Sequence, residues 1–457
     1  MDADKRIAEL EEKVAALLVV VAERDVRIAE LQGLLEESRR TGKRQSAPFS
    51  KGKPKDEPAK PGRKRGDGHG RHGHREVPPV TDRVVDAPLP GSCPECGGDV
   101  EFERWADQYQ AELPEPRAVV TRFRVGVGRC RCCRARVQGR HPEQTSDALG
   151  AAGSQVGPRA MAWGKWLHYG LGLSFAKCSA VLARLGVNVT AGAICSSSTS
   201  TCTDLALTHS AIVAHVGTAP AVTMDETGWR IGGERGCWLW VAATEDATVY
   251  DVARGRRFED AVRLVEEEYS GTIVRDGYVV YNHYTHATHQ SCLAHLVRRC
   301  KEMEQDQPSW TISTPRAVKD LLHQALDARD LPKRGRAAAA IQIGDRLDSL
   351  IDQPHPHDAN RRLMKHLAHQ RHALFTFLNL DGVDATNWRG EQGVRPAVVN
   401  RKVWGGNRTD VGALTQSRLM TFLRTAHQQS LDAIELLVDL ARAPTPGIVA
   451  GLTLRPG

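Results

Sequence analysis

The sequence predicts a multidomain protein with an α/β core, and three observations support this assignment. A heptad repeat fills residues 1–38, two Cys-x-x-Cys pairs lie between residues 93 and 133, and alternating strand and helix patterns run from Ala221 to Cys300. A chain of 457 residues is long enough for about two to four domains with real cores. We therefore expect a coiled coil, a zinc-ribbon-like domain and an α/β catalytic core, in that order.

The first 38 residues show two apolar positions per heptad, and only Arg24 interrupts the pattern. The first position is mostly β-branched and the second is leucine, which is typical of parallel two-stranded coiled coils. We predict that residues 1–38 make the protein a homo-oligomer; the alternative is a single amphipathic helix packed on its own domain. The two positions are Ile7, Val14, Val21, Ile28 and Leu35, and Leu10, Leu17 and Leu31.

Residues 39–85 are predicted to be a basic, disordered linker. Between Arg39 and Arg75 the chain has thirteen Lys and Arg, three acidic residues and almost no large apolar side chains, so it cannot build a core. The segment is either a passive tether or an arm that binds DNA phosphates. Its histidines, His69, His72 and His74, are expected to lie in a solvated turn rather than a metal site. The cations singled out for DNA are Arg63, Lys64 and Arg65.

A cysteine cluster defines the next domain, residues 86–145. Two Cys-x-x-Cys pairs, each on a tight knuckle, offer four thiolates to one tetrahedral Zn²⁺. Cys132 is a surplus thiol that could replace Cys133. A closed site of this kind holds a small fold together and carries out no chemistry. The expected ligands are Cys93, Cys96, Cys130 and Cys133.

Residues 146–217 are predicted to be helical. The short break at Gly186, before Thr190, resembles a helix-turn-helix that could bind DNA, although most short helix pairs are only packing units. Apolar spacing predicts helices over Ala160–Leu167, Ala176–Leu185 and Ala193–Val213.

The predicted catalytic core, residues 218–303 and 380–410, has the order strand, strand, strand, helix, strand. This is the order of a ribonuclease-H-like core, in which the first and fourth strands lie side by side. Asp225 and Asp276 each end one of these strands, so the fold should bring them together to hold divalent metal. The elements are a strand from Ala221 ending in Met224-Asp225-Glu226-Thr227-Gly228-Trp229, strands Gly236–Thr244 and Thr248–Ala253, a helix over Phe258–Tyr269 and a strand over Gly271–Val274.

Residues 304–379 are predicted to be an all-helical insertion, and residues 411–457 a C-terminal helix and tail. Cys292 and His295, at the start of a predicted helix, could form half of a metal site. No second pair lies nearby, so a structural role is favoured. The helices expected here are Leu293–Met303, Pro315–Ala328, Arg334–Gln353, His357–Leu378 and Val411–Ala443.

Glu391 is the candidate for a third catalytic carboxylate. It lies early in a predicted helix that Thr386 can cap and whose length Pro396 limits. A lone Glu there is usually only a favourable partner of the helix dipole, but this one follows two strand-end aspartates. Asp381 and Asp384 are the alternatives. The basic residues that follow on a segment suited to DNA phosphates include Arg395, Arg401 and Lys402.

Three ordered blocks carry a resemblance to a known family. They are Asp-Glu-Thr-Gly-Trp-Arg at 225–230, Asp-Gly-Tyr-Val-Val-Tyr-Asn at 276–282 with Cys292-Leu-Ala-His295-Leu after it, and Asn-Trp-Arg-Gly-Glu-Gln-Gly-Val-Arg-Pro at 387–396. Over most of its length the chain resembles DDE transposases of the insertion-sequence-66 family. It departs from the family pattern at Trp388, where a second Asn is usual, and at Gln392, where Arg is usual.

The resemblance implies catalysis by Asp225, Asp276 and Glu391, and a zinc domain that binds DNA. Such carboxylates hold two Mg²⁺ ions about 3.5–4 Å apart, which activate water or a 3′-hydroxyl and stabilise the leaving oxygen. The expected function is cleavage and strand transfer at the terminal inverted repeats of a bacterial insertion sequence. The partners would be double-stranded DNA, as transposon ends and target, and small accessory proteins of the element.

Two other functions stay open: a catalytically inactive zinc-ribbon, coiled-coil DNA-binding protein, and a metal-dependent DNA nuclease without strand transfer. A net charge of +7, concentrated in one segment, favours a polyanionic partner. The longest apolar run, Val14 to Ala22, is far below the roughly 20 residues that span a bilayer. The N-terminus lacks a signal pattern, so we expect a cytoplasmic protein without membrane contact, whose eleven cysteines are metal ligands and buried thiols.

Overall fold

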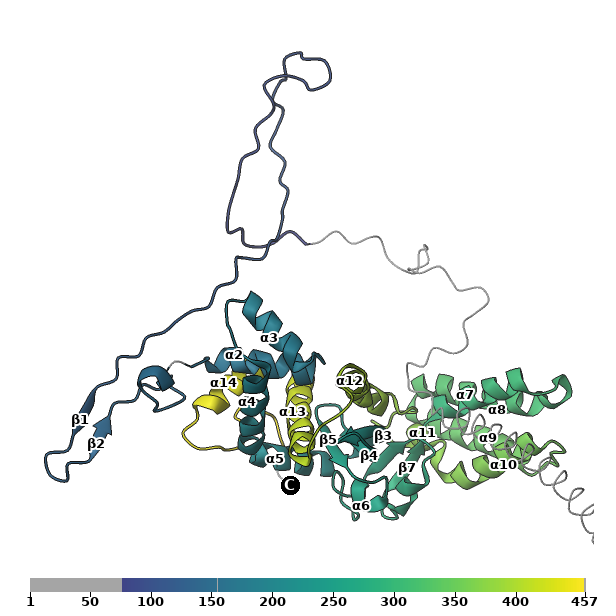
Figure 1. Ribbon diagram of the computed structural model, residues 1–457. Helices are drawn as coiled ribbons and strands as arrows, with labels where there is room; N and C mark the ends of the chain where they lie inside the picture. Colours follow the sequence, from purple (N-terminus) through teal and green to yellow (C-terminus); the bar gives the residue numbers. More distant parts are fainter. Residues whose placement is uncertain (1–75, 154, 456–457) are drawn as a thin grey trace, which may run out of the picture. The chain divides into compact units, whose positions relative to one another are not determined.

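The computed structural model of the protein describes residues 76–153 and 155–455 (Figure 1). They fall into two compact units, divided after Glu112. The predicted coiled coil and most of the predicted basic linker, with Arg63, Lys64 and Arg65, lie outside the described residues. The described part of the first unit, residues 76–112, has turns but no helix or strand.

The second unit begins with a small hairpin and continues into helices. The hairpin consists of β1 (Val127–Arg129) and β2 (Arg136–Gln138), which pair antiparallel. Side-chain oxygens of Ser174 and Thr190 accept hydrogen bonds from the first turns of α3 and α4 and so cap these helices. The helices are α2 (Pro158–Lys165), the π-helix η3 (Trp166–Gly170), α3 (Phe175–Arg184), α4 (Ala191–Asp204) and α5 (Ala206–Gly217).

The single helix predicted over Ala193–Val213 is wrong, because the chain breaks at Leu205 between α4 and α5. The last turn of α4 has the sequence Thr-Cys-Thr-Asp. Such residues are weak helix formers whose side chains compete for backbone hydrogen bonds. The pattern of apolar residues continues across this break, so periodicity alone could not detect it.

A five-stranded mixed sheet forms the core of the unit, in the order β5-β4-β3-β6-β7. The first three strands along the chain pair antiparallel, whereas β6 pairs parallel with β3 and β7 pairs parallel with β6. The predicted contact between the first and fourth strands is therefore confirmed. The strands are β3 (Ala221–Ile231), β4 (Glu234–Ala243), β5 (Thr248–Ala253), β6 (Thr272–Arg275) and β7 (Thr288–Ser291).

Two predictions in this region need correction. The predicted helix over Phe258–Tyr269 is only one turn, α6 (Phe258–Ala261). Glu266, Glu267 and Glu268 would have formed its last turn, where negative charge opposes the helix dipole. The fifth strand, β7, was not predicted, because its four residues, Thr-His-Gln-Ser, lack the apolar character of a buried strand.

The outer edge of the sheet is covered by helix α13 (Asp410–Gln428) through a matched row of hydrogen bonds (Figure 1). The amides of Thr248, Tyr250 and Val252 in β5 donate to hydroxyl oxygens of α13 at 3.2, 2.9 and 3.0 Å. Four residues of a helix rise about 6 Å and two residues of a strand about 6.6 Å. The spacing of the α13 hydroxyls therefore matches the spacing of the β5 amides. The edge cannot pair with another chain. The acceptors are Thr425, Thr421 and Ser417.

The predicted C-terminal helix over Val411–Ala443 is two helices, α13 and α14 (Ala433–Arg442). Ser430 between them has a left-handed backbone with φ 57°, and the Asp432 carboxylate caps α14 by accepting from two backbone amides. Propensity patterns did not indicate this break.

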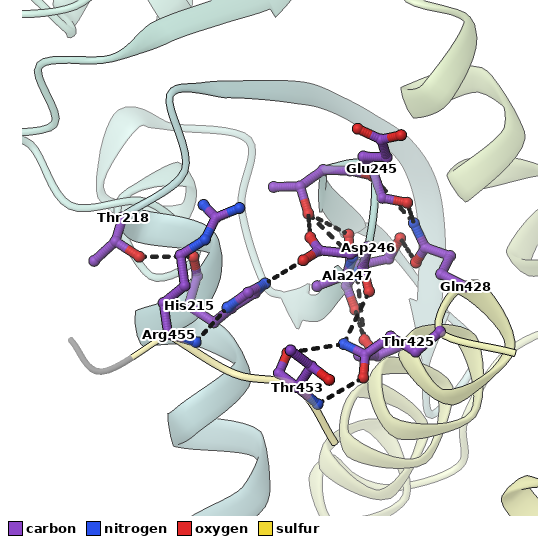
Figure 2. Close-up of polar contacts among 12 residues, drawn as sticks. His215, Thr218, Glu245, Asp246, Ala247, Thr425, Gln428, Thr453 and Arg455 are labelled. Atoms are coloured by element: carbon purple, nitrogen blue, oxygen red, sulfur yellow. Dashed lines mark hydrogen bonds and ion pairs between the residues drawn. The ribbon is translucent and has the colours of Figure 1, made fainter. Parts of the chain in front are cut away.

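The last described residues are tied to α5 and to the turn between β4 and β5 (Figure 2). The Arg455 amide donates to His215 Nδ1 at 2.7 Å, and His215 Nε2 lies 3.1 Å from Asp246 Oδ2. Gln429 Oε1 accepts from the Thr453 amide at 2.8 Å. These bonds hold the C-terminal segment beside the sheet.

The predicted helical insertion has its own hydrophobic core and packs beside β7 (Figure 1). The predicted helix over His357–Leu378 is broken after Gln370, where Arg371 turns to form an ion pair with Asp348. Its helices are α7 (Leu293–Asp306), α8 (Ser313–Asp327), α9 (Lys333–Ile351), α10 (Asp358–Gln370) and α11 (Thr376–Asn379), and α12 (Trp388–Trp404) follows.

Short turns of 3-10 helix complete the described elements: η2 (Gly150–Gly153), η4 (Val279–His283), η5 (Ser309–Thr311), η6 (Ala328–Asp330) and η7 (Arg371–Ala373). None of the helices in residues 76–455, apart from the undescribed position 154, combines the length and apolar character that a membrane span requires.

The edge-covering bonds can be tested with Thr421→Val. Valine keeps the shape of threonine but cannot accept the hydrogen bond from the Tyr250 amide, which would stay buried and unpaired. We expect the free energy of unfolding to fall by about 1–3 kcal/mol in urea titrations. The control is Thr203→Val at an exposed position of α4, expected to change stability by less than about 0.5 kcal/mol. Equal effects of the two substitutions would contradict the role of Thr421.

Candidate active site

The parallel pairing of β3 with β6 brings two aspartates together. The last paired residues are Thr223 and Val274, and Asp225 and Asp276 each lie two residues further along. Because side chains alternate between faces with a period of two, both aspartates continue on the same face of the sheet as that pair. The two predicted site residues are therefore neighbours.

Asp225, however, does not end its strand as predicted. β3 continues to Ile231, paired only with β4, because Gly232 and Gly233 take positive φ angles of 62° and 85° and close a tight hairpin. β6 ends at Arg275. Asp225 thus lies just beyond the point where β3 loses its pairing with β6.

Glu391 approaches from the first turn of α12. The helix start packs directly on β3, since a Cβ added at Gly390 would lie 3.0 Å from the Asp225 Cβ. Glu391 Oε1 lies 3.6 Å from His295 Nε2 and 4.0 Å from an Arg298 nitrogen. The three predicted catalytic carboxylates therefore come from β3, the end of β6 and α12.

Two details of this helix were predicted wrongly. Its N-cap is Asn387 rather than Thr386, and it runs through Pro396 to Trp404. Proline removes one helical hydrogen bond. Near this point the Tyr250 hydroxyl donates to the Gly393 carbonyl at 2.8 Å, a bond from β5 that helps to hold the interrupted helix.

The electrostatics of the cluster oppose a bare negative charge on Asp225. Burial raises the pKa of Asp225 well above its ordinary value, and the neighbouring charges of Glu226, Asp276 and Glu391 raise it further. A divalent cation would reverse this effect. The buried Asn387 amide, which touches the same Gly390 position, has no hydrogen-bond partner among the described residues. These features fit a hydrated cation at this place.

A second network behind the aspartates was not predicted. Glu226 is buried and forms an ion pair with Arg256, and the Tyr281 hydroxyl donates to it. The Arg256 guanidinium lies 3.7 Å from the ring centre of Tyr278, whose amide donates to Asp276 Oδ1 at 2.8 Å. The network links β3 to the loop that carries Asp276. The sequence signal was the acidic residue after Asp225 and the tyrosine two residues after Asp276.

The alternative carboxylates are engaged elsewhere. Asp381 is exposed and forms an ion pair with Arg336, and Asp384 lies 2.7 Å from the Arg389 guanidinium.

The three basic residues of α12 that were predicted to bind DNA differ in burial. Arg401 is half-buried and donates to the Thr227 hydroxyl at 3.2 Å and to the Gly228 carbonyl, whereas Arg395 and Lys402 are exposed. Burial lowers the pKa of Arg401. Arg401 therefore has a structural role, because it bonds to β3, in addition to its predicted role in DNA binding.

Each predicted zinc-binding cysteine pair forms its own knuckle. In the first unit the Cys93 amide donates to the Gly98 carbonyl and the Gly97 amide to the Cys93 carbonyl, both at 2.8 Å. In the second unit Cys130, Arg134 and Ala135 repeat this pattern at 3.0 and 2.9 Å. Backbone amides, including those of the second cysteine in each pair, Cys96 and Cys133, lower the pKa of Cys93 and Cys130. Cys132 is exposed.

Within residues 76–153 and 155–455, no three His, Cys, Asp or Glu side chains lie close enough together to hold a metal ion as they stand. This applies to the carboxylates and to the cysteines. Each cysteine knuckle offers two thiols, so the four-cysteine zinc site stays a prediction. Glu391, for its part, is turned toward His295 and Arg298.

Comparison with known families identifies the chain. The model of the transposase IS66 family matches residues 153–415, which include Asp225, Asp276 and Glu391. The chain belongs to the transposase IS66 family. A search of curated proteins finds no match. Membership supports a role as a transposase with DNA-cleaving activity, and it confirms the family indicated by the three sequence blocks. The cysteine knuckles and α14 of this IS66 transposase lie outside the matched residues.

The charge cluster of this IS66 transposase predicts a stabilising substitution. Because the folded-state pKa of Asp225 is raised, its contribution to stability is present at low pH and is lost as the pH rises through that pKa. Asp225→Asn should therefore raise the free energy of unfolding at neutral pH in EDTA, because the amide carries no charge to be buried or repelled by Glu226, Asp276 and Glu391. The difference should vanish below about pH 4, where the carboxyl is protonated in both the folded and the unfolded state.

The measurement is denaturant unfolding across pH, with Asp345→Asn at an exposed position of α9 as control. The control should stay within about 0.5 kcal/mol of the wild type. Millimolar Mg²⁺ should stabilise the wild type more than Asp225→Asn, because a ligand stabilises the state that binds it. A destabilised Asp225→Asn in EDTA would argue against the charge cluster.

Proposed function

We propose that this IS66 transposase cuts and joins DNA at the terminal inverted repeats of its own insertion sequence, using Asp225, Asp276 and Glu391. The observation that carries the proposal is the pairing of β3 with β6, which makes two aspartates neighbours and sets α12 against them. The strand order β5-β4-β3-β6-β7 agrees with a ribonuclease-H-like catalytic core.

In this mechanism Asp225, Asp276 and Glu391 would hold two Mg²⁺ ions, which supply activation of water or a 3′-hydroxyl and stabilisation of the leaving oxygen. The chain's own residues prepare the site. The Tyr278 amide holds the Asp276 carboxylate, and the Arg256 ion pair keeps Glu226 from competing with the catalytic carboxylates. His295 and Arg298 balance the charge of Glu391 until metal and DNA arrive.

DNA binding would be divided among several segments. The basic linker, residues 39–85, and the cations Arg395 and Lys402 would contact phosphates. The helix pair α3 and α4 would act as a helix-turn-helix, which its left-handed Gly186, with φ 82°, and its capped second helix support. Residues 1–38 would join two protomers so that both ends of the element are bound together.

The zinc-binding domain, residues 86–145, makes a separate prediction. If the two knuckles share one ion, the purified protein should carry about one zinc per chain. Cys93→Ser and Cys130→Ser should each lose it, because three thiolates bind Zn²⁺ far more weakly than four. Cys132→Ser should keep it, since the second knuckle is built on Cys130 and Cys133. Elemental analysis decides, and a metal-free wild type would end the zinc proposal.

The central test replaces each catalytic carboxylate by its amide: Asp225→Asn, Asp276→Asn and Glu391→Gln. Each change removes one charge at constant shape, so metal binding is lost while DNA contacts stay. We expect cleavage and strand transfer to fall at least about a thousandfold, roughly 4 kcal/mol of transition-state stabilisation. Binding to a labelled terminal-repeat duplex in Ca²⁺ should change less than about threefold, because phosphate contacts dominate affinity.

Asp381→Asn is the matched control, since this carboxylate is exposed and already paired with Arg336. It should cleave like the wild type. Normal cleavage by Glu391→Gln together with inactive Asp384→Asn would replace the third ligand but keep the core. Normal cleavage by all three variants would rule out the two-metal mechanism, and cleavage without joining by the wild type would favour a nuclease.

A further inference from the structure

A small cavity of about 100 Å³ lies beside the catalytic carboxylates, between the end of β6 and helices α7 and α10. Its wall includes Gly277, Cys292, His295, Arg299, His366 and Gln370. The volume is well below the roughly 300 Å³ at which pockets for organic ligands begin. A nucleobase is therefore too large for it, whereas a single small oxyanion is not.

Three of the residues that line the cavity, His295, Arg299 and His366, are basic, and no Asp or Glu lines it. Among the described residues, neither Arg299 nor His366 makes a hydrogen bond or ion pair, and His295 Nδ1 is buried without a partner. A buried polar atom such as His295 Nδ1 is costly when it is left unpaired, and Arg299 and His366 are half-buried. The site thus has unused donors for an anion.

A second arginine, Arg275, adds to the positive potential beside the cavity. Arg275 is fully buried behind the cavity wall and donates to Gln370 Oε1 at 2.6 Å. Burial lowers the pKa of His366, and the charges of Arg299 and Arg275 lower it further. Burial also lowers the pKa of Arg299. An anion in the cavity would relieve the repulsion among these groups.

The cavity adjoins the proposed site of catalysis on two sides. Gly277 directly follows Asp276, and a Cβ added at Gly277 would lie 3.3 Å from the His366 ring, so glycine leaves the backbone exposed there. On the other side, His295 Nε2 lies 3.6 Å from Glu391 Oε1. A group bound in the cavity would lie next to whatever the carboxylates hold.

We propose that this cavity binds one backbone phosphate of the DNA strand, adjacent to the scissile phosphate, through Arg299, His366 and His295. The inference rests on the proposed function, because it needs DNA at the carboxylates. Guanidinium and imidazole donors suit phosphate oxygens, and such contacts set the register of a strand without reading its sequence. The helical insertion, through α7 and α10, would thereby position the strand for catalysis.

The test is a methylphosphonate scan of the terminal-repeat duplex, in which each phosphate flanking the cleavage position is made neutral in turn. Binding is measured in Ca²⁺, and cleavage of the unmodified duplex is measured in Mg²⁺. In the wild type, one flanking substitution should weaken binding about tenfold or more, the usual effect of losing a charged hydrogen bond. In Arg299→Gln and in His366→Gln the same substitution should cause no further loss.

Arg346→Gln is the matched control, because this exposed arginine on α9 bonds to Gln324 and does not line the cavity. It should keep the wild-type scan. Arg299→Lys preserves the charge and should keep part of the sensitivity, which separates loss of a contact from misfolding. Thermal unfolding of each variant accompanies the scan.

Full sensitivity of Arg299→Gln and His366→Gln at every flanking position would overturn the proposal. So would stabilisation by inorganic phosphate that Arg299→Gln abolishes while the scan stays unchanged, because the cavity would then be a site for free phosphate. A wild type that cleaves normally in either case leaves the proposed function intact. A wild type that neither binds nor cleaves the repeat would instead refute the proposed function itself.

Discussion

The parallel contact between β3 and β6 is the constraint on which the rest of the candidate site depends. Only three residue pairs make it, ending at Thr223 and Val274. Beyond them β3 continues with β4 while β6 ends, so Asp225 and Asp276 lie just past the last shared pair. α12 fits against β3 at Gly390 because no side chain intervenes. A register shift of one residue would turn Asp225 to the opposite face of the sheet.

Bringing Asp225, Asp276 and Glu391 together opposes folding, because their negative charges repel one another. Contacts around the cluster offset part of this unfavourable free energy. The raised pKa of Asp225 reflects burial and three neighbouring acidic groups. Around it, the Arg256–Glu226 ion pair compensates the charge of Glu226, and the hydroxyl row of α13 holds the outer edge of the sheet. The carboxylates of this IS66 transposase repel one another at the place where metal and DNA would bind. Active sites are often less stable than the rest of a fold for this reason, because function requires the groups that repel.

Helices of the insertion contact the candidate active site, although they are far from its carboxylates along the chain. α7 begins directly after β7, and its His295 reaches Glu391 of α12. His366 comes from α10 yet meets the backbone at Gly277. The insertion therefore closes one side of the carboxylate cluster with cations, while α12 closes another. The proposed phosphate-binding cavity therefore lies next to the proposed two-metal site.

The sequence by itself determined the family, the order of the first four core strands and the three candidate carboxylates, because strand alternation and the short motifs around Asp225, Asp276 and Glu391 are local signals. Sequence patterns did not indicate strand β7, the breaks at Leu205 and Ser430, or the path of α12 through Pro396. Contacts from elsewhere in the fold accompany two of them: the Asp432 carboxylate caps α14 after Ser430, and the Tyr250 hydroxyl supports α12 near Pro396. The Glu226 network and the cationic cavity arise only in the tertiary structure. Their members, such as Arg299 and His366, lie far apart in the chain, and only the packing of α7 and α10 against the end of β6 makes them neighbours.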